Sequence, residues 1–417
     1  MHRVALVSGV RTPFVKAGGA FAALSALDLA TTVTTALAER LPVEVSDIDE
    51  LTFSSVLLDP RIPNLAREIV LRSKLPKTLP AHFVSNNCIS GLVAVSQIAS
   101  AIATGRIQTG IAGGVESMSC PALALKPSAE RLFLKLARAR TLSERLGVIS
   151  QFRFRHLVPI PPSPKEPSTG LTMGQHCELT AQELGISREA QDLWAFQSHQ
   201  RAASAADMLA QDIVSVNGVT RDTLVRSDTS LEKLAALNPV FDRSSSGSIT
   251  AGNASALTDG AAALFLASEE FVTTRRLPVL AWIDGIQFSA LDPAHGLLMA
   301  PVFALPQLLS RSAIRLESID RFEIHEAFSA QVLANLQVWE TGWKRYPDYK
   351  PLGPISRDRI NLLGGSIALG HPFAATGGRL MLSLARQLDG SSVKRGVISV
   401  CAAGGMACAL SLSVPAD

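Results

Sequence analysis

The sequence predicts an α/β protein in which helices cover a largely parallel sheet and the same unit occurs twice. In residues 1–119, short apolar runs alternate with longer segments of helical periodicity. This alternation is typical of parallel strands joined by helices. Two stretches of the first half also match two stretches of the second half in the same order.

The expected elements follow one another regularly in this first part. The expected strands are residues 3–14, 48–56, 81–87 and 109–117, and the expected helices are residues 25–41, 65–75 and 90–105. Because a helix separates each strand from the next, we expect these strands to run parallel.

The duplication is indicated by two offsets along the chain. Residues 46–55 match residues 317–326 at an offset of 271, and residues 90–110 match residues 376–396 at an offset of 286. Any two βαβ segments resemble each other to some degree, and that explanation stays open. Two matches in the same order nevertheless favour duplication.

The composition is that of an ordered protein with two or three lobes, since 417 residues exceed the size of a single core. Only 5% of the residues are aromatic, so we expect Ala, Leu, Val and Ile to fill the interior. The net charge of +3 gives no global field for nucleic acid, and no nucleic-acid partner is expected.

The cysteines and the N-terminus bear on the compartment. The five cysteines are widely spread and form no CxxC pair, which argues against a disulfide framework or a zinc site. No early apolar stretch reaches signal-peptide length and no later one suits a membrane span. We therefore expect a soluble intracellular protein, located in a bacterial cytoplasm or, if a presequence has been removed, in the mitochondrial matrix.

Residues 120–249 interrupt the alternation. Residues 121–156 carry eight Lys or Arg against two acids, and their leucines recur at near-helical spacing. This pattern predicts one or two basic amphipathic helices, followed by a stiff proline-rich connector at residues 157–170. Two interpretations stay open. The segment is a lid with a solvated basic face, or it is a contact surface for anionic phosphates, lipid or a partner.

Cys88 lies where a predicted strand meets a predicted helix. The free N–H groups and positive end of that helix would favour a thiolate, which suits a nucleophile. A buried core thiol is the more frequent explanation of a lone cysteine. His325, His371 and Cys401 follow strands or glycine-rich turns of the second half. In a duplicated scaffold such loops converge, so we expect these four side chains to share one pocket.

Eight stretches, taken together, resemble the thiolase family. They are "RTPF", "NNCISGL", "GGVESMS", "MGQHCE", "TAGNASALTDGAA", "HEAF", "GGSIALGHPFAATGGR" and "CAAGGM", which occur in family order from about residue 4 to about residue 412. The resemblance implies two duplicated βαβαβαββ units that form a five-layered αβαβα core, with an inserted, mainly helical loop domain. The implied boundaries are 1–119 with 250–274 for the N-terminal half, 120–249 for the loop domain and 275–417 for the C-terminal half.

The resemblance also implies an activity, the cleavage of 3-ketoacyl-CoA by CoA through an acyl-cysteine intermediate, and roles for the site residues. Cys88 would be the nucleophile and Cys401 the acid/base at the α-carbon of acetyl-CoA. His371 would activate Cys88 and, with a water held by His325, stabilise the enolate oxygen. The backbone N–H groups of Cys88 and Ala403 would form a second oxyanion hole.

Five further positions match family positions beside the pantetheine arm of CoA: Met173, Ala251, Ser255, Ala327 and Phe328. CoA is thus expected as a co-substrate, and no permanently bound cofactor is implied. The remaining histidines form no HxxxH or HxH pair, so no metal site is expected.

Within the family, His325 and "CAAGG" resemble the thiolase (beta) subunit of fatty-acid β-oxidation trifunctional enzymes, and Thr172 argues against a dedicated short-chain role. The implied partners are further copies of the chain, in a homodimer or higher homo-oligomer, and a hydratase/3-hydroxyacyl-CoA dehydrogenase alpha subunit. The basic segment at residues 121–156 adds a peripheral membrane surface as an expected contact. Ala374 and Ala407 stand where the family usually has glycine. Alanine has less backbone freedom than glycine, so whether the turns near the site keep the geometry of the family stays open. A condensing acetoacetyl-CoA thiolase and a non-catalytic acyl-CoA binding protein remain alternatives.

Overall fold

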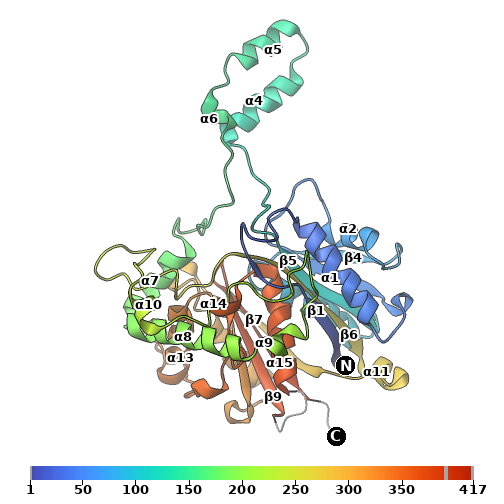
Figure 1. Ribbon diagram of the computed structural model, residues 1–417, viewed down its shortest axis with the longest axis vertical. Coiled ribbons are helices and arrows are strands. Elements are labelled where there is room, and N and C mark those ends of the chain that lie inside the picture. The colour runs from blue at the N-terminus through green and yellow to red at the C-terminus, as the bar shows by residue number, and fades with distance from the viewer. Residues whose placement is uncertain (1, 389–392, 415–417) are drawn as a thin grey trace. The chain divides into compact units, whose positions relative to one another are not determined.

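The computed structural model describes residues 2–388 and 393–414 (Figure 1). Its strands are β1 (Val4–Arg11), β2 (Val15–Lys16), β3 (Glu50–Ser54), β4 (Ala81–Val84), β5 (Thr109–Glu116), β6 (Thr258–Ser268), β7 (Ala281–Ala290), β8 (Arg321–Ile324), β9 (Arg395–Ala402) and β10 (Met406–Ser413). Its α-helices are α1 (Ala26–Arg40), α2 (Leu65–Arg72), α3 (Ser90–Ala103), α4 (Pro127–Arg138), α5 (Leu142–Ile149), α6 (Phe154–Leu157), α7 (Met173–Leu184), α8 (Arg188–Ser204), α9 (Ala206–Ala210), α10 (Leu231–Ala235), α11 (Glu269–Arg275), α12 (Pro301–Arg311), α13 (Ser329–Thr341), α14 (Ser366–Leu369) and α15 (Thr376–Leu388).

The strands show the predicted duplication. Their order is β4-β3-β5-β6-β1-β7-β10-β9-β8, with β2 added beside β6. Strands β3 and β5 pair in parallel, as do β8 and β9, and each pair is followed by two antiparallel partners. The two offsets found in the sequence relate the starts of β3 and β8, of β5 and β9, and of α3 and α15. Duplication is therefore confirmed.

The second half departs from the first at one strand. β4 pairs with β3 over four residues, but the corresponding neighbour of β8 is a single bridge between Phe322 and Ile360. The two halves meet where β1 and β7 pair at Val4–Leu6. The sheet layers of the two halves are thus parts of one hydrogen-bonded sheet.

The main core lies around α3 and α15, which pack against each other and against strands of both halves. Its members are mostly Ala, Leu, Val and Ile, as the low aromatic content predicted. Close packing at this seam depends on small residues. A Cβ added to Gly91 or Gly114 would lie 2.3 or 2.0 Å from the carbonyl oxygen of Ala374. The start of α3 and the turn before α15 are therefore in direct contact.

Residues 57–63 and 121–164 form a compact unit of their own. Where the sequence predicted one or two helices, residues 121–156 form three short ones, α4, α5 and α6. Thr141 and Glu144 close a capping box at the start of α5, and the rings of Phe133 and Phe152 meet edge to face at 4.9 Å. Large apolar side chains remain exposed on these helices, namely Phe133, Leu134, Leu142, Leu146, Ile149, Phe154 and Leu157.

The rest of the predicted loop domain, residues 165–249, belongs to the larger unit and carries α7 to α10. None of the helices in the described ranges has the length and apolar character needed to cross a bilayer.

Candidate active site

Cys88 lies in the turn between β4 and α3, as predicted. The turn is fixed by Ser90, whose hydroxyl accepts from the N–H of Asn86 at 2.7 Å and donates to the carbonyl of Asn87 at 2.6 Å. Asn87 adopts a φ of 47°, a left-handed conformation that asparagine tolerates better than most residues. Cys88 is partly buried at the start of α3.

The turn between β9 and β10 lies against the turn that carries Cys88. The side-chain amide of Asn87 donates to the carbonyl of Ala403 at 3.0 Å, and the N–H of Ala403 points at the sulfur of Cys88. Gly404 and Gly405 have φ values of 78° and 68°, so glycine is required there. The N–H of Gly404 donates to Glu166 at 2.9 Å, which holds the far side of the turn.

Burial favours the neutral form of both thiols, so the thiolate that the sequence predicted for Cys88 at the helix start is not favoured in the structure. Burial raises the pKa of Cys88 to about 12, although the N–H groups of Ala403 and of Cys88 itself lower it in part. Burial also raises the pKa of Cys401 well above its ordinary value, and the neighbouring thiols of Cys88 and Cys177 raise it further. A nucleophilic Cys88 therefore needs a base within the site.

The two predicted histidines form a pair. His325 follows β8 and His371 lies in the turn before α15, and their ring centroids are 4.0 Å apart. Nδ1 of His325 is 2.8 Å from the hydroxyl of Ser366, and Nδ1 of His371 is 2.7 Å from that of Thr376. Among the described residues neither Nε2 has a hydrogen-bond partner, and both are buried.

Both imidazoles are neutral as well. Burial lowers the pKa of His371 to about 3 and that of His325 well below its ordinary value, and the guanidinium of Arg379 adds to both effects. Neutral imidazoles can accept a proton from a thiol or donate a hydrogen bond to an oxygen, depending on the tautomer.

The segment at residues 250–257 runs beside both histidine turns. Leu257 forms a bridge with His371, and Ala254 forms one with Phe328, three residues after His325. The N–H of Ser255 donates to the carbonyl of Ala327 at 3.0 Å. The predicted CoA-binding residues of this segment thus lie next to those of "HEAF".

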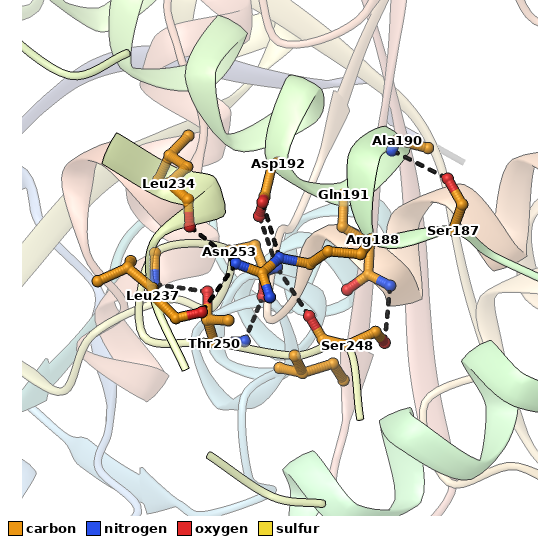
Figure 2. Close-up of polar contacts among 12 residues, drawn as sticks. Ser187, Arg188, Ala190, Gln191, Asp192, Leu234, Leu237, Ser248, Thr250 and Asn253 are labelled. Carbon is orange, nitrogen blue, oxygen red and sulfur yellow. Dashed lines mark hydrogen bonds and ion pairs between the residues drawn. The ribbon is translucent and has the colours of Figure 1, made fainter. Parts of the chain in front are cut away.

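A polar network holds this segment in place (Figure 2). Asn253 donates to Asp192 at 2.9 Å and to the carbonyl of Ser248 at 3.2 Å, while it accepts from the N–H of Thr250 at 2.8 Å. Arg188 pairs with Asp192 at 2.7 Å and also donates to two carbonyls at the end of α10. Helix α8 therefore positions Ala251 and Ser255 through Asn253.

Met173 begins α7 after the capping residue Thr172. It packs, with Ala327, against an apolar cluster that contains Phe328 and Cys401. One predicted CoA-binding residue of the loop domain thus packs on the same apolar cluster as the predicted catalytic thiol of the C-terminal half.

Both parts of the chain match descriptions of one family. "Thiolase, N-terminal domain" matches residues 4–270, and "Thiolase, C-terminal domain" matches residues 277–414. The chain belongs to the thiolase family.

Relatives of this thiolase match it over nearly its whole length. A protein of Serratia proteamaculans (strain 568) named 3-ketoacyl-CoA thiolase is 38% identical over 99% of this chain and 97% of its own. One of Pseudoalteromonas translucida (strain TAC 125) with the same name is 39% identical, with 98% and 96% covered.

Solved thiolase structures have the same fold. The acetyl-CoA acetyltransferase of Bacillus anthracis superimposes with a TM-score of 0.84 at 30% identity, with 99% of each chain covered. A thiolase from Ascaris suum, solved in complex with coenzyme A, gives 0.83 at 30% identity, with 99% of this chain and 100% of the other covered.

This thiolase has alanine at two positions where the family usually has glycine, and the backbone is unstrained at both. Ala374 and Ala407 are absent from the described non-glycine residues with positive φ. Ala374 lies in a short 3-10 helix and Ala407 in β10, where any residue fits.

Sequence reasoning missed the residues that hold the groups predicted to be catalytic. They are Asn87, Glu166, Ser366, Thr376 and Arg379. Asn87 adjoins Cys88 in the quoted motif and could have been noticed. Nothing in the proline-rich text around Glu166 indicates that its carboxylate meets a turn more than 200 residues later.

Proposed function

We propose that this thiolase cleaves 3-ketoacyl-CoA with CoA, giving acetyl-CoA and a shortened acyl-CoA. The observation that carries the proposal is the site itself. The turn at Ala403 lies between the two thiols, and the two imidazoles stand beside each other with Nε2 atoms that have no hydrogen-bond partner among the described residues. The full-length relatives named 3-ketoacyl-CoA thiolase support the substrate class.

In the proposed first half-reaction, the Cys88 sulfur attacks the 3-keto carbon while its proton passes to Nε2 of His371, and the N–H groups of Cys88 and Ala403 stabilise the resulting oxyanion. The proton moves during the attack because the raised pKa of the thiol and the lowered pKa of the imidazole disfavour a separate ion pair. The bond between C2 and C3 breaks, which leaves the acyl group on Cys88 and the electron pair on the enolate of acetyl-CoA. Cys401 protonates that enolate, whose oxygen faces the two imidazoles.

In the second half-reaction, the Cys401 thiolate takes the proton of an incoming CoA thiol. The CoA sulfur attacks the acyl thioester, the bond to Cys88 breaks, and the Cys88 sulfur recovers its proton from His371. Each proton and bond is thus restored, and CoA acts as a substrate.

A condensing acetoacetyl-CoA thiolase is the second candidate, and the likeness to the acetyl-CoA acetyltransferase of Bacillus anthracis favours it. The same groups would run the reaction in reverse. Thr172, which caps α7 and leaves no imidazole at that position, favours the degradative role on longer chains.

A steady-state thiolysis assay with short, medium and long 3-ketoacyl-CoA substrates tests the proposal. We expect the largest kcat/KM for medium or long chains. Activity confined to acetoacetyl-CoA would favour the second candidate, and binding of acyl-CoA without turnover would favour the non-catalytic alternative.

We further propose that the enzyme acts as a homodimer in fatty-acid β-oxidation, beside a hydratase/3-hydroxyacyl-CoA dehydrogenase subunit. Strand β4 supports the dimer, because it ends the sheet and its Phe83 and Val84 are only partly buried. Light scattering should give twice the chain mass of 44.2 kDa. Co-purification with the other two activities tests the complex.

Helices α4 to α6 favour a peripheral contact with an anionic membrane, since exposed apolar side chains and basic residues lie on the same short helices. We expect the triple change Leu142→Ser, Leu146→Ser and Ile149→Ser to abolish sedimentation with anionic vesicles and to leave thiolysis of soluble substrate intact. The control is Leu231→Ser, an exposed leucine of α10. If the wild-type protein does not sediment with the vesicles, the membrane proposal is wrong, and helices α4 to α6 would instead serve as a lid or as a contact surface for another protein.

A further inference from the structure

His325 and His371 stand side by side but have different partners. Their rings are 4.0 Å apart, and each uses Nδ1 for one hydroxyl group, Ser366 for His325 and Thr376 for His371. The partners differ in what else reaches them. Arg379 donates to the hydroxyl oxygen of Ser366 at 2.9 Å, whereas among the described residues no further donor reaches that of Thr376.

This difference decides where the proton lies. A guanidinium has only donors, so the oxygen of Ser366 must accept from Arg379. The hydroxyl hydrogen of Ser366 then needs an acceptor, and within the described residues Nδ1 of His325 is the one in reach. An Nδ1 that accepts carries no proton, so the neutral ring carries it on Nε2.

Arg379 is well placed for this task. Its side chain is fully buried between Ser366 and Glu323, whose carboxylate lies 3.4 Å from the guanidinium. The buried cation also opposes a second proton on His325, because two positive charges would share a dry site. His325 thus stays neutral.

We infer that Arg379, acting through Ser366, fixes the Nε2–H tautomer of His325 and makes this imidazole a hydrogen-bond donor to the reacting thioester oxygen or to its bound water. No donor like Arg379 reaches Thr376 among the described residues, so its hydroxyl can either accept from Nδ1–H of His371 or donate to that nitrogen. The base role proposed for His371 requires the first arrangement, and only the tautomer of His325 is fixed by a neighbouring cation. Arg379 and Ser366 are positioning residues, and their effect on the reaction rests on the proposed function.

The tautomer can be measured directly in the full-length enzyme. Nitrogen-15 labelling of the eight histidines, with His325→Gln to assign the signals, reports which ring nitrogen of His325 carries the proton. We expect Nε2–H in the wild type. Ser366→Ala removes the donor to Nδ1, so the proton should distribute over both nitrogens.

The matched control is Ser411→Ala, which removes an equally buried hydroxyl that has no partner among the described residues. It should leave the His325 signals unchanged. In the same variants we expect kcat to fall about 10- to 100-fold for Ser366→Ala, with little change in KM, and to stay constant for the control.

A wild-type His325 with its proton on Nδ1 would overturn the inference, as would an unchanged tautomer in Ser366→Ala. The wild-type spectrum decides the matter even if Ser366→Ala fails to fold. An enzyme that shows the expected tautomer but no thiolysis would instead refute the proposed function and leave the inference standing.

Discussion

The two halves of the molecule share a scaffold but contribute different residues to the candidate site. At the offset of 286, Cys88 corresponds to Ala374 and Val115 to Cys401, and at the offset of 271, Ser54 corresponds to His325. In each pair one residue belongs to the candidate site and its counterpart does not. Ser54, for example, is buried and donates to the carbonyl of Gly113 at 2.8 Å.

The comparison shows how a duplicated fold makes one asymmetric site. Equivalent strand ends of the two halves meet where the halves join, so only one residue of each equivalent pair needs a reactive or polar side chain. The other residue of the pair can be small and pack closely. Ala374, for instance, brings its carbonyl against positions where only glycine fits, Gly91 and Gly114. Variants at equivalent positions of the two halves test whether only one member of each pair serves the reaction.

The largest effect is expected for Cys88→Ala. Without the nucleophile no acyl-enzyme can form, and thiolysis should fall more than ~10⁴-fold. Intact-protein mass spectrometry after mixing with 3-ketoacyl-CoA reads the acyl adduct. The control is Cys408→Ala, which removes a buried thiol of β10 and should retain the adduct. An adduct on the Cys88→Ala protein would disprove the assignment.

Cys401→Ala should slow thiolysis ~10²- to 10⁴-fold, because the enolate loses its proton donor while Cys88 remains. Exchange of the α-protons of acetyl-CoA with deuterated water should also disappear. Its counterpart Val115→Ala should lower the free energy of unfolding by roughly 0.5–3 kcal/mol and leave kcat per folded enzyme unchanged. Retained exchange in Cys401→Ala would assign the acid/base role elsewhere.

His325→Ala should lower kcat about 10²- to 10³-fold, the cost of one oxyanion donor. Ser54→Ala, at the equivalent strand end, should only weaken folding by about 0.5–1.5 kcal/mol, the net value of its hydrogen bond to Gly113. Urea unfolding and steady-state kinetics on both proteins check this contrast. A fall in kcat for Ser54→Ala would contradict the purely structural role assigned to this position.

The smallest effect concerns pH. Because the pKa of Cys88 is raised to about 12, the thiolate fraction at neutral pH is small and grows as pH rises. Alkylation of Cys88 by iodoacetamide should therefore accelerate about tenfold per pH unit beyond pH 9, without a plateau there. Since the pKa of His371 is lowered to about 3, that imidazole stays neutral across this range and no step is expected near pH 6.5.

The alkylation control is the Cys88→Ala protein, whose remaining thiols give the background rate. A plateau near pH 9 would mean that the sulfur is as well solvated as a free cysteine.

The sequence by itself determined the fold class and the duplication, and it supplied the side chains that are proposed to react. Alternating apolar runs and helical segments are local patterns, and the offsets of 271 and 286 match the observed starts of β8, β9 and α15. The motifs that contain Cys88, His325, His371 and Cys401 are likewise short, contiguous stretches of sequence, so no knowledge of the tertiary structure is needed to find them.

Only the tertiary structure decided how these groups are held and protonated. Asn87 meets Ala403 across 316 residues, and Glu166 meets Gly404 across 238. Ser366 and Arg379 are inferred to determine the tautomer of His325. Both lie in a glycine-rich stretch of sequence, and no local pattern there shows which side chains form hydrogen bonds in the folded protein. A pKa depends on burial and on neighbours in space, and neither is a property of a short stretch of chain.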